Sequence, residues 1–185
     1  MPGFAPLIAF QTSGGTSTLP ETFEGRVGEC FEKTLRYPGH FDLLCELKEL
    51  GLFSSEKIRI NGTEIAPRAM MAKIFEGKFA SKGPDVCIMR LEAHESVRSP
   101  GVRGLLGGKI KGRVASFTLV DHYDPKTDMS AMMRTTAFPA SIVLQMLASG
   151  AIAKRGAVLQ ERDVPADMFL EEMEKRGIHV EYKIE

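Results

Sequence analysis

The chain has 185 residues, of which 43% are hydrophobic and 26% are charged, and this ordinary globular composition excludes a disordered chain. The 24 Lys and Arg residues balance 24 Asp and Glu residues, giving a formal net charge of zero, without the basic surplus of a typical nucleic-acid binder. No apolar run approaches the roughly 20 residues of a membrane span, and the first twenty residues lack a signal-peptide pattern. We therefore expect a cytoplasmic protein without nucleic-acid or membrane partners.

The first half of the chain is predicted to combine short extended segments with two helices. An apolar segment over 7–12 precedes a Ser/Gly/Thr-rich break, and a strand is predicted over 27–37. Apolar residues at helical spacing predict a helix over 41–50 that stops at Gly51. Asn61-Gly62 between isoleucines predicts a hairpin over 58–65. A helix over 67–75 is expected to begin at Pro67 and to close at Gly77.

The second half is predicted to hold the longest elements. Strands are expected over 85–93, 113–123 and 178–184, and helices over 135–149 and 165–176. These elements follow no strict βαβ order. The fold class is therefore predicted as α+β, a mixed, largely antiparallel sheet with helices packed on one face. Residues 1–185 are expected to form a single domain without internal repeats.

The common chemical motifs are absent. No G-x-G-x-x-G follows a predicted strand, and Gly107-Gly108-Lys109 continues with Ile110 where a P-loop requires Ser or Thr. The three cysteines are far apart and form no C-x-x-C pair, which disfavours a disulfide framework and a metal site. No nucleophile–base pair can be assigned. The catalytic residues therefore stay unknown, and no metal is expected.

Residues 33–40 (KTLRYPGH) are one candidate for a ligand site. Arg36 at the end of a predicted strand can hold a carboxylate in a two-pronged contact, and Thr34 can complete an anion site. The alternative is that Arg36 faces water or pairs with a nearby glutamate. Tyr37 and His40 lie in the turn that follows.

Two loops are further candidates. In residues 11–20, which include Ser13, hydroxyls and glycines allow a ligand to approach the backbone. A poorly ordered N-terminal loop is the equally good alternative. Residues 96–112 and their neighbour Arg113 could bind an anion or nucleic acid, but a solvated hairpin loop is the favoured interpretation. The basic residues concerned are Arg98, Arg103, Lys109, Lys111 and Arg113.

At these segments the sequence resembles the C-terminal half of the saccharopine dehydrogenase and lysine 6-dehydrogenase family. The matching segments are spread in the family's order over nearly the whole chain. They are AFQTSGGTSTLP (9–20), KTLRYPGH (33–40), KELGLF (48–53), DVCIMRLE (85–92) and MRTTAFPA (133–140).

The resemblance implies a substrate-binding and dimerisation domain from an oxidoreductase that transfers a hydride at the carbon–nitrogen bond of an amino acid. Thr34, Leu35 and Arg36 match the family's substrate-contacting segment, with Arg36 holding a carboxylate. Ser13 lies near a second family contact, although the local pattern departs there, and Tyr37 and His40 are plausible neighbours. A homodimer with paired sheets is expected. Lysine, saccharopine and other amino acids stay open as substrates.

The family's N-terminal Rossmann domain, which holds NAD or NADP, is missing from this sequence. Hydride transfer requires the cofactor against the substrate, so the chain alone is expected to be inactive and to bind no cofactor. The alternative is a free-standing, non-catalytic interaction or small-molecule-binding module. The helix over 135–149 is apolar nearly all round, so it is expected to be buried on most sides. If the Rossmann domain normally covers one side, the chain alone would expose an apolar patch or bury it by association.

Overall fold

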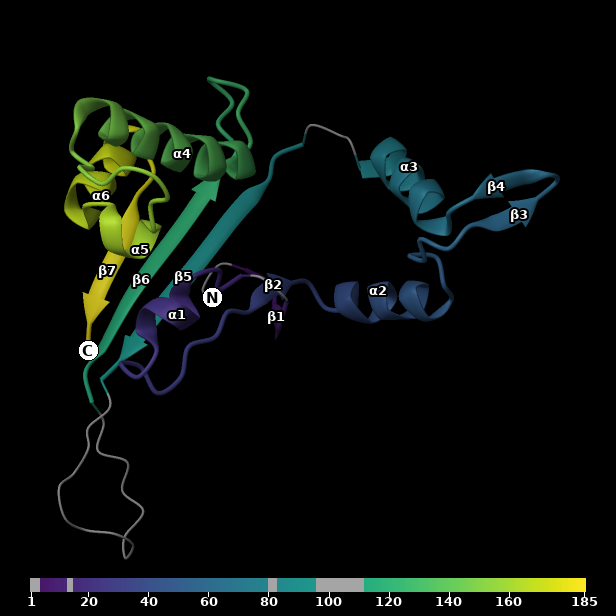
Figure 1. The fold of residues 1–185 in the computed structure, drawn as a ribbon, viewed down its shortest axis with the longest axis horizontal. Coiled ribbons are helices and arrows are strands. Elements are labelled where there is room, and N and C mark those ends of the chain that lie inside the picture. Colours follow the sequence, from purple (N-terminus) through teal and green to yellow (C-terminus); the bar gives the residue numbers. More distant parts are fainter. Residues whose placement is uncertain (1–3, 13–14, 80–82, 96–111) are drawn as a thin grey trace, which may run out of the picture. The chain divides into compact units, whose positions relative to one another are not determined.

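The computed structural model describes residues 4–12, 15–79, 83–95 and 112–185. Residue contacts divide the chain into two compact units, Met1–Ser81 (the N-terminal unit) and Lys82–Glu185 (the C-terminal unit). Figure 1 draws both units, and each is described by itself below. Among the described helices, none is both long and apolar enough to cross a membrane. The prediction of a single family domain over 1–185 stays a prediction.

Within its described residues, the N-terminal unit contains two small antiparallel strand pairs and three helices. Its elements are β1 (Ile8–Phe10), α1 (Leu19–Phe23), β2 (Thr34–Arg36), α2 (His40–Glu49), β3 (Ile58–Ile60), β4 (Thr63–Ile65) and α3 (Pro67–Phe79). Strand β1 pairs with β2, and β3 pairs with β4. The predicted helix over 41–50 is confirmed as α2, and Gly51, with φ of 79°, follows its end.

The predicted hairpin is also confirmed. Asn61 and Gly62 have φ of 50° and 86°, which is the left-handed conformation that a tight two-residue hairpin turn requires at both central positions. By contrast, Gly77 does not end α3, which continues to Phe79. An interior glycine costs a helix only about 1 kcal/mol, and Phe75 and Phe79 contact each other across that turn with ring centroids 5.5 Å apart.

The strand predicted over 27–37 is much shorter in the structure. Only Thr34–Arg36 forms β2, because its partner β1 is itself three residues long and pairs Ile8 with Arg36 and Phe10 with Thr34. Extended residues without a paired neighbour gain no ladder hydrogen bonds. The strand propensity of residues 27–37 therefore predicted a strand in the right part of the chain but not the length of that strand.

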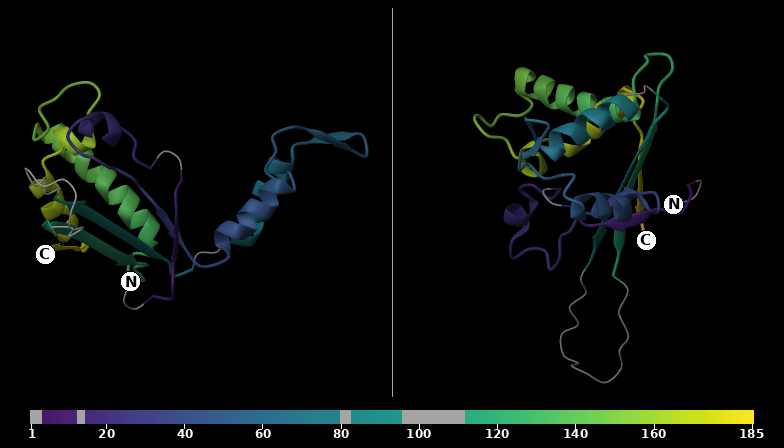
Figure 2. Two further views of the ribbon diagram at one scale, coloured as in Figure 1. Left: turned by 90° about the horizontal axis from the view of Figure 1, so that it is seen from below. Right: turned by 90° about the vertical axis from the view of Figure 1, so that its right-hand side faces the viewer.

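The C-terminal unit is a three-stranded antiparallel sheet with helices on one side. Its elements are β5 (Val86–His94), β6 (Val114–His122), α4 (Ala131–Ser149), α5 (Gln160–Asp163), α6 (Ala166–Lys175) and β7 (Val180–Ile184). The strand order is β5-β6-β7, and both views of Figure 2 show α4 and α6 on the same side of these strands. The predicted α+β class, with antiparallel pairing and helices on one face, is confirmed.

The core lies between that sheet and its helices. Ile142 and Met146 of α4 meet Leu119 of β6 and Met173 of α6 in a single buried cluster. Ile152 and Ile178 complete it. This packing uses only one side of α4: Ile142 is 1% exposed, whereas Leu144 is 67% exposed. The expectation that α4 is buried on most sides is therefore wrong for the described chain.

Helix α4 begins four residues before the predicted start, because side chains bind its first N–H groups. Ser130 accepts a hydrogen bond from Met133 N at 3.0 Å, and the Asp85 carboxylate accepts from Ala131 N and Met132 N at 2.6 and 3.0 Å. These N–H groups have no partner inside a helix. At the other end Gly150, with φ of 80°, ends the helix as predicted.

On the side of the sheet that packs against the helices, apolar side chains continue along the strands beyond the part that the helices cover. Leu119 of β6 faces the helices. Because side chains alternate along a strand, the residues two and four positions before it, Phe117 and Ala115, lie on the same side of the sheet. The next row holds Leu91, Phe117 and Tyr182 in register, with Phe117 and Tyr182 stacked at 4.7 Å between ring centroids. Leu91 is nevertheless 51% exposed and Tyr182 52% exposed. This row, with Ile184 beyond it, is called the open sheet end below.

Candidate functional site

Strand β2 places three of the predicted site residues. Side chains alternate along a strand, so Thr34 and Arg36 lie on one side and Leu35, which pairs with Ala9, lies on the other. Thr34 and Leu35 are half-buried and Arg36 is exposed. The rings of Phe10 and Phe41, with centroids 4.6 Å apart, join β1 to the first turn of α2. The end of β2 is therefore held next to the start of a helix.

Arg36 keeps most of its donors free within the described residues. Its Nη1 donates to the carbonyl oxygen of Leu35 at 2.7 Å, and no carboxylate in the described part of the chain pairs with it. Of the two alternatives, pairing with a nearby glutamate is not found there, whereas the exposed Arg36 side chain agrees with the other, that it faces water. A guanidinium carries five N–H donors, so the exposed head can still hold a carboxylate through two parallel hydrogen bonds.

Tyr37 and His40 belong to the turn after β2. Tyr37 is exposed, and its carbonyl oxygen accepts from His40 N at 3.3 Å. Gly39, with φ of 85°, allows the chain to turn directly into α2, of which His40 is the first residue. Both side chains are exposed and near Arg36 in the chain, but among the described residues neither makes a hydrogen bond or ion pair with Thr34 or Arg36.

Thr34 takes part in a polar cluster that the sequence did not predict. Thr34 Oγ1 donates to Glu32 Oε1 at 3.2 Å, Thr12 Oγ1 donates to Glu32 Oε2 at 3.1 Å, and the two hydroxyl oxygens are 3.0 Å apart. Thr12 follows β1 and Glu32 precedes β2, so the strand pairing brings them together. Continuing the alternation of β2 back by two residues would have pointed to Glu32.

Two other predicted regions lie outside the described residues. Ser13 is one, so its role in substrate contact stays a prediction. The basic segment with Arg98, Arg103, Lys109 and Lys111 is the other. Its described neighbour Arg113 is paired with Glu95, whose carboxylate accepts from Arg113 Nε at 3.2 Å. Hydrogen bonds from Arg113 hold the pKa of Glu95 below its usual value.

A comparison with protein families decides the relationship. The family described as the saccharopine dehydrogenase C-terminal domain matches residues 2–178. The chain belongs to this family. The predicted resemblance is thereby confirmed over nearly the whole chain.

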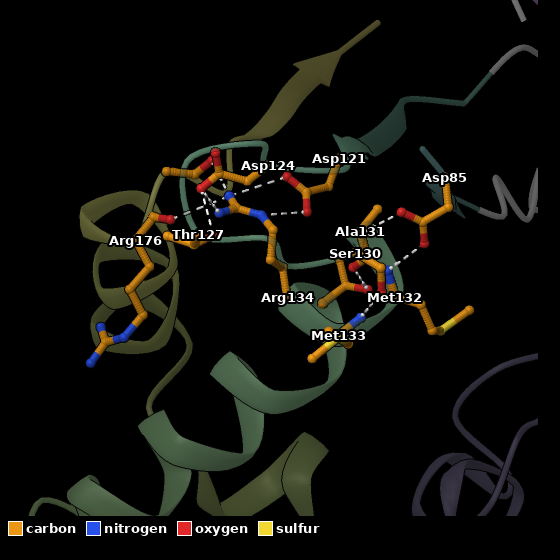
Figure 3. A network of polar contacts seen from close by, with 12 residues as sticks. Asp85, Asp121, Asp124, Thr127, Ser130, Ala131, Met132, Met133, Arg134 and Arg176 are labelled. Atoms are coloured by element: carbon orange, nitrogen blue, oxygen red, sulfur yellow. Dashed lines mark hydrogen bonds and ion pairs between the residues drawn. The ribbon is translucent and has the colours of Figure 1, made fainter. Parts of the chain in front are cut away.

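Arg134 is the centre of a polar network in the C-terminal unit of this saccharopine dehydrogenase C-terminal domain (Figure 3). Arg134, from MRTTAFPA, donates from Nε and Nη2 to the two Asp121 oxygens at 2.9 and 3.3 Å. Its Nη2 also lies 3.4 and 3.2 Å from the carbonyl oxygens of Arg176 and Gly177. Asp124 lies 3.6 Å from Nη1. One guanidinium thus joins α4, the end of β6 and the chain after α6.

This network stabilises the fold, because the charged side chains in it are paired within the chain. The side chains of Arg134 and Asp121 are 11% and 9% exposed, and every deeply buried side-chain polar atom of the described residues has a partner. Asp124 also accepts from Lys126 N and the Thr127 hydroxyl, and these hydrogen bonds hold its pKa below the usual value. Asp85, from DVCIMRLE, caps α4 beside it.

Proposed function

We propose that this chain is the substrate-binding and dimerisation half of an NAD- or NADP-dependent amino-acid dehydrogenase of the saccharopine or lysine type, located in the cytoplasm. The observation that carries the proposal is Arg36, an exposed guanidinium on the same side of β2 as Thr34, in the segment that resembles the family's substrate contact. Full enzymes of the family use NAD or NADP. In this proposal a Rossmann domain supplies the cofactor, and the chain alone binds the amino acid without turnover.

The chemistry of the site supports carboxylate recognition. An amino-acid carboxylate offers two coplanar oxygens, which match the parallel N–H groups of a guanidinium. The Thr34 side chain lies on the same side of the strand and supplies a further polar contact. In this proposal the chain's role is to bind and orient the substrate.

Replacing Arg36 with alanine should weaken binding of L-lysine and saccharopine by about tenfold to a hundredfold, because a charged hydrogen bond contributes about 1.5–3 kcal/mol. Isothermal titration calorimetry with the full 185-residue chain measures the dissociation constants. Lys33→Ala removes a neighbouring cation on the other side of the strand and serves as the control. Equal affinities of wild type and Arg36→Ala for these ligands would show that Arg36 does not belong to the binding site. Absence of any amino-acid binding by wild type would favour the interaction module instead.

The proposed homodimer is supported by the open sheet end. Leu91, Phe117, Tyr182 and Ile184 form an apolar surface on the side of the sheet where the helices stop. Exposed contiguous apolar surface of this kind marks an association site. The opposite side of the same strands carries polar residues such as Arg90, Glu92 and His94, which suit contact with water.

Leu91→Arg should convert a dimer to a monomer, because a buried unpaired charge in the interface is strongly unfavourable. Light scattering of the full chain at micromolar concentration measures the mass. His94→Arg places a charge on the opposite side of the same strand and should leave the dimer intact. A monomeric wild type, or a Leu91→Arg variant that stays dimeric, would contradict this interface.

A further inference from the structure

The cluster of Thr12, Glu32 and Thr34 is rich in hydrogen-bond acceptors. Its three oxygen–oxygen contacts, between 3.0 and 3.2 Å, share only two hydroxyl protons when Glu32 is ionised. Either hydroxyl can donate to the other or to the carboxylate, so one of the three contacts is always left without a proton. A carboxylate has about four lone-pair sites, and the hydroxyls occupy at most two. The cluster therefore lacks donors and favours a ligand that brings them.

The backbone of Gly15 holds the carboxylate in this position. A Cβ built on Gly15 would collide with the Glu32 carboxylate oxygen Oε2, and it would lie 2.5 Å from Cδ and 2.8 Å from Cγ. A side chain at position 15 would therefore force the Glu32 carboxylate to move from this position. The Glu32 carboxylate thus contacts the hydroxyls of Thr12 and Thr34 and lies close to the loop at Gly15. No Lys or Arg in the described part of the chain neutralises it.

The cluster lies on the same side of the strand as Arg36. The contact between Glu32 and Thr34, two residues apart, places these side chains together, and alternation places Arg36 on that side too. Four residues of extended chain span about 13 Å, and the reach of both side chains shortens the gap. Glu32 and Arg36 therefore place a negative and a positive group on the same side of this segment.

We propose that Glu32, positioned by Thr12, Thr34 and Gly15, binds the terminal ammonium group of a long amino-acid substrate whose carboxylate is held by Arg36. This inference rests on the proposed function and assigns a specificity-determining residue to the same site. An alkylammonium carries three N–H donors, which fit two hydroxyl oxygens and one carboxylate. A divalent metal ion fits less well, because Mg²⁺ and Ca²⁺ take six or more oxygen ligands, and no three metal-ligating side chains gather among the described residues.

The test compares L-lysine with L-norleucine, which keeps the carboxylate and α-ammonium groups but lacks the terminal ammonium. Titration of the full chain should show lysine binding about tenfold to a hundredfold more tightly. Glu32→Gln should remove this preference by weakening lysine binding while leaving norleucine binding within about twofold. Glu29→Gln, an exposed glutamate of the same segment, is the matched control and should change neither.

Gly15→Ala and Thr12→Val test the positioning without touching the carboxylate itself. Both should shift the ratio of lysine to norleucine binding in the direction of Glu32→Gln, with circular dichroism confirming an intact fold. A Glu32→Gln variant that keeps the preference, or that loses both ligands equally, overturns the inference. If wild type binds both ligands equally and Arg36→Ala abolishes both, only the role of Glu32 fails. If wild type binds neither ligand, the inference and the proposed function both fail.

Discussion

Arg134→Met should lower the unfolding free energy of the C-terminal unit by about 3–5 kcal/mol, the usual cost of removing one partner of a buried ion pair. Methionine keeps much of the volume but leaves Asp121 buried without its cation, and the Arg176 and Gly177 carbonyl groups lose a donor. Urea denaturation followed by circular dichroism measures the loss.

Two further variants separate charge pairing from packing. Arg90→Met removes an exposed arginine that pairs with Glu92 on β5, and it should cost less than about 1 kcal/mol because surface ion pairs contribute little. The double variant Arg134→Met/Asp121→Leu should recover most of the lost stability, because apolar replacement of a whole buried pair is often neutral. A cost below about 1 kcal/mol for Arg134→Met would show that water already screens the pair.

Ile142→Ala should destabilise the C-terminal unit by about 2–5 kcal/mol. Ile142 lies in the cluster between α4, β6 and α6, and the deletion leaves a cavity that its neighbours fill only in part. The same denaturation measurement applies. Leu144→Ala, two residues along the helix and exposed, should change stability by no more than about 0.5 kcal/mol. Equal effects of the two variants would contradict the observed orientation of α4.

Local signals in the sequence predicted the elements whose stability is local. The Asn61-Gly62 hairpin, the end of α2 at Gly51 and the end of α4 at Gly150 each depend on a few adjacent residues, and all three are found. The start of α4 depends on Asp85, 46 residues earlier in the chain. The length of β2 likewise depends on a distant partner strand. Single-sequence patterns do not contain such long-range pairing.

The same distinction applies to the candidate site. Arg36 and Thr34 were predictable because a guanidinium and a hydroxyl two residues apart on a strand share a side. Glu32 was predictable only by extending that alternation, and Thr12 and Gly15 required the pairing of β1 with β2. The apolar pattern of α4 predicted a helix buried on most sides, whereas only one side is packed against this sheet. A sequence pattern indicates which residues of a helix are apolar, but it does not indicate which part of the molecule packs against them.

The position in the chain of the groups that accept hydrogen bonds from Arg134 also determines when the C-terminal unit can fold during synthesis. The carbonyl groups of Arg176 and Gly177, and the strand β7 that pairs with β6, are made more than forty residues after Arg134 itself. Until they leave the ribosome, the guanidinium lacks its full set of partners and β6 has a bare edge. The N-terminal unit has its strand pairs complete by residue 65. Nascent chains should therefore fold vectorially, with the C-terminal unit exposed to chaperones for longest.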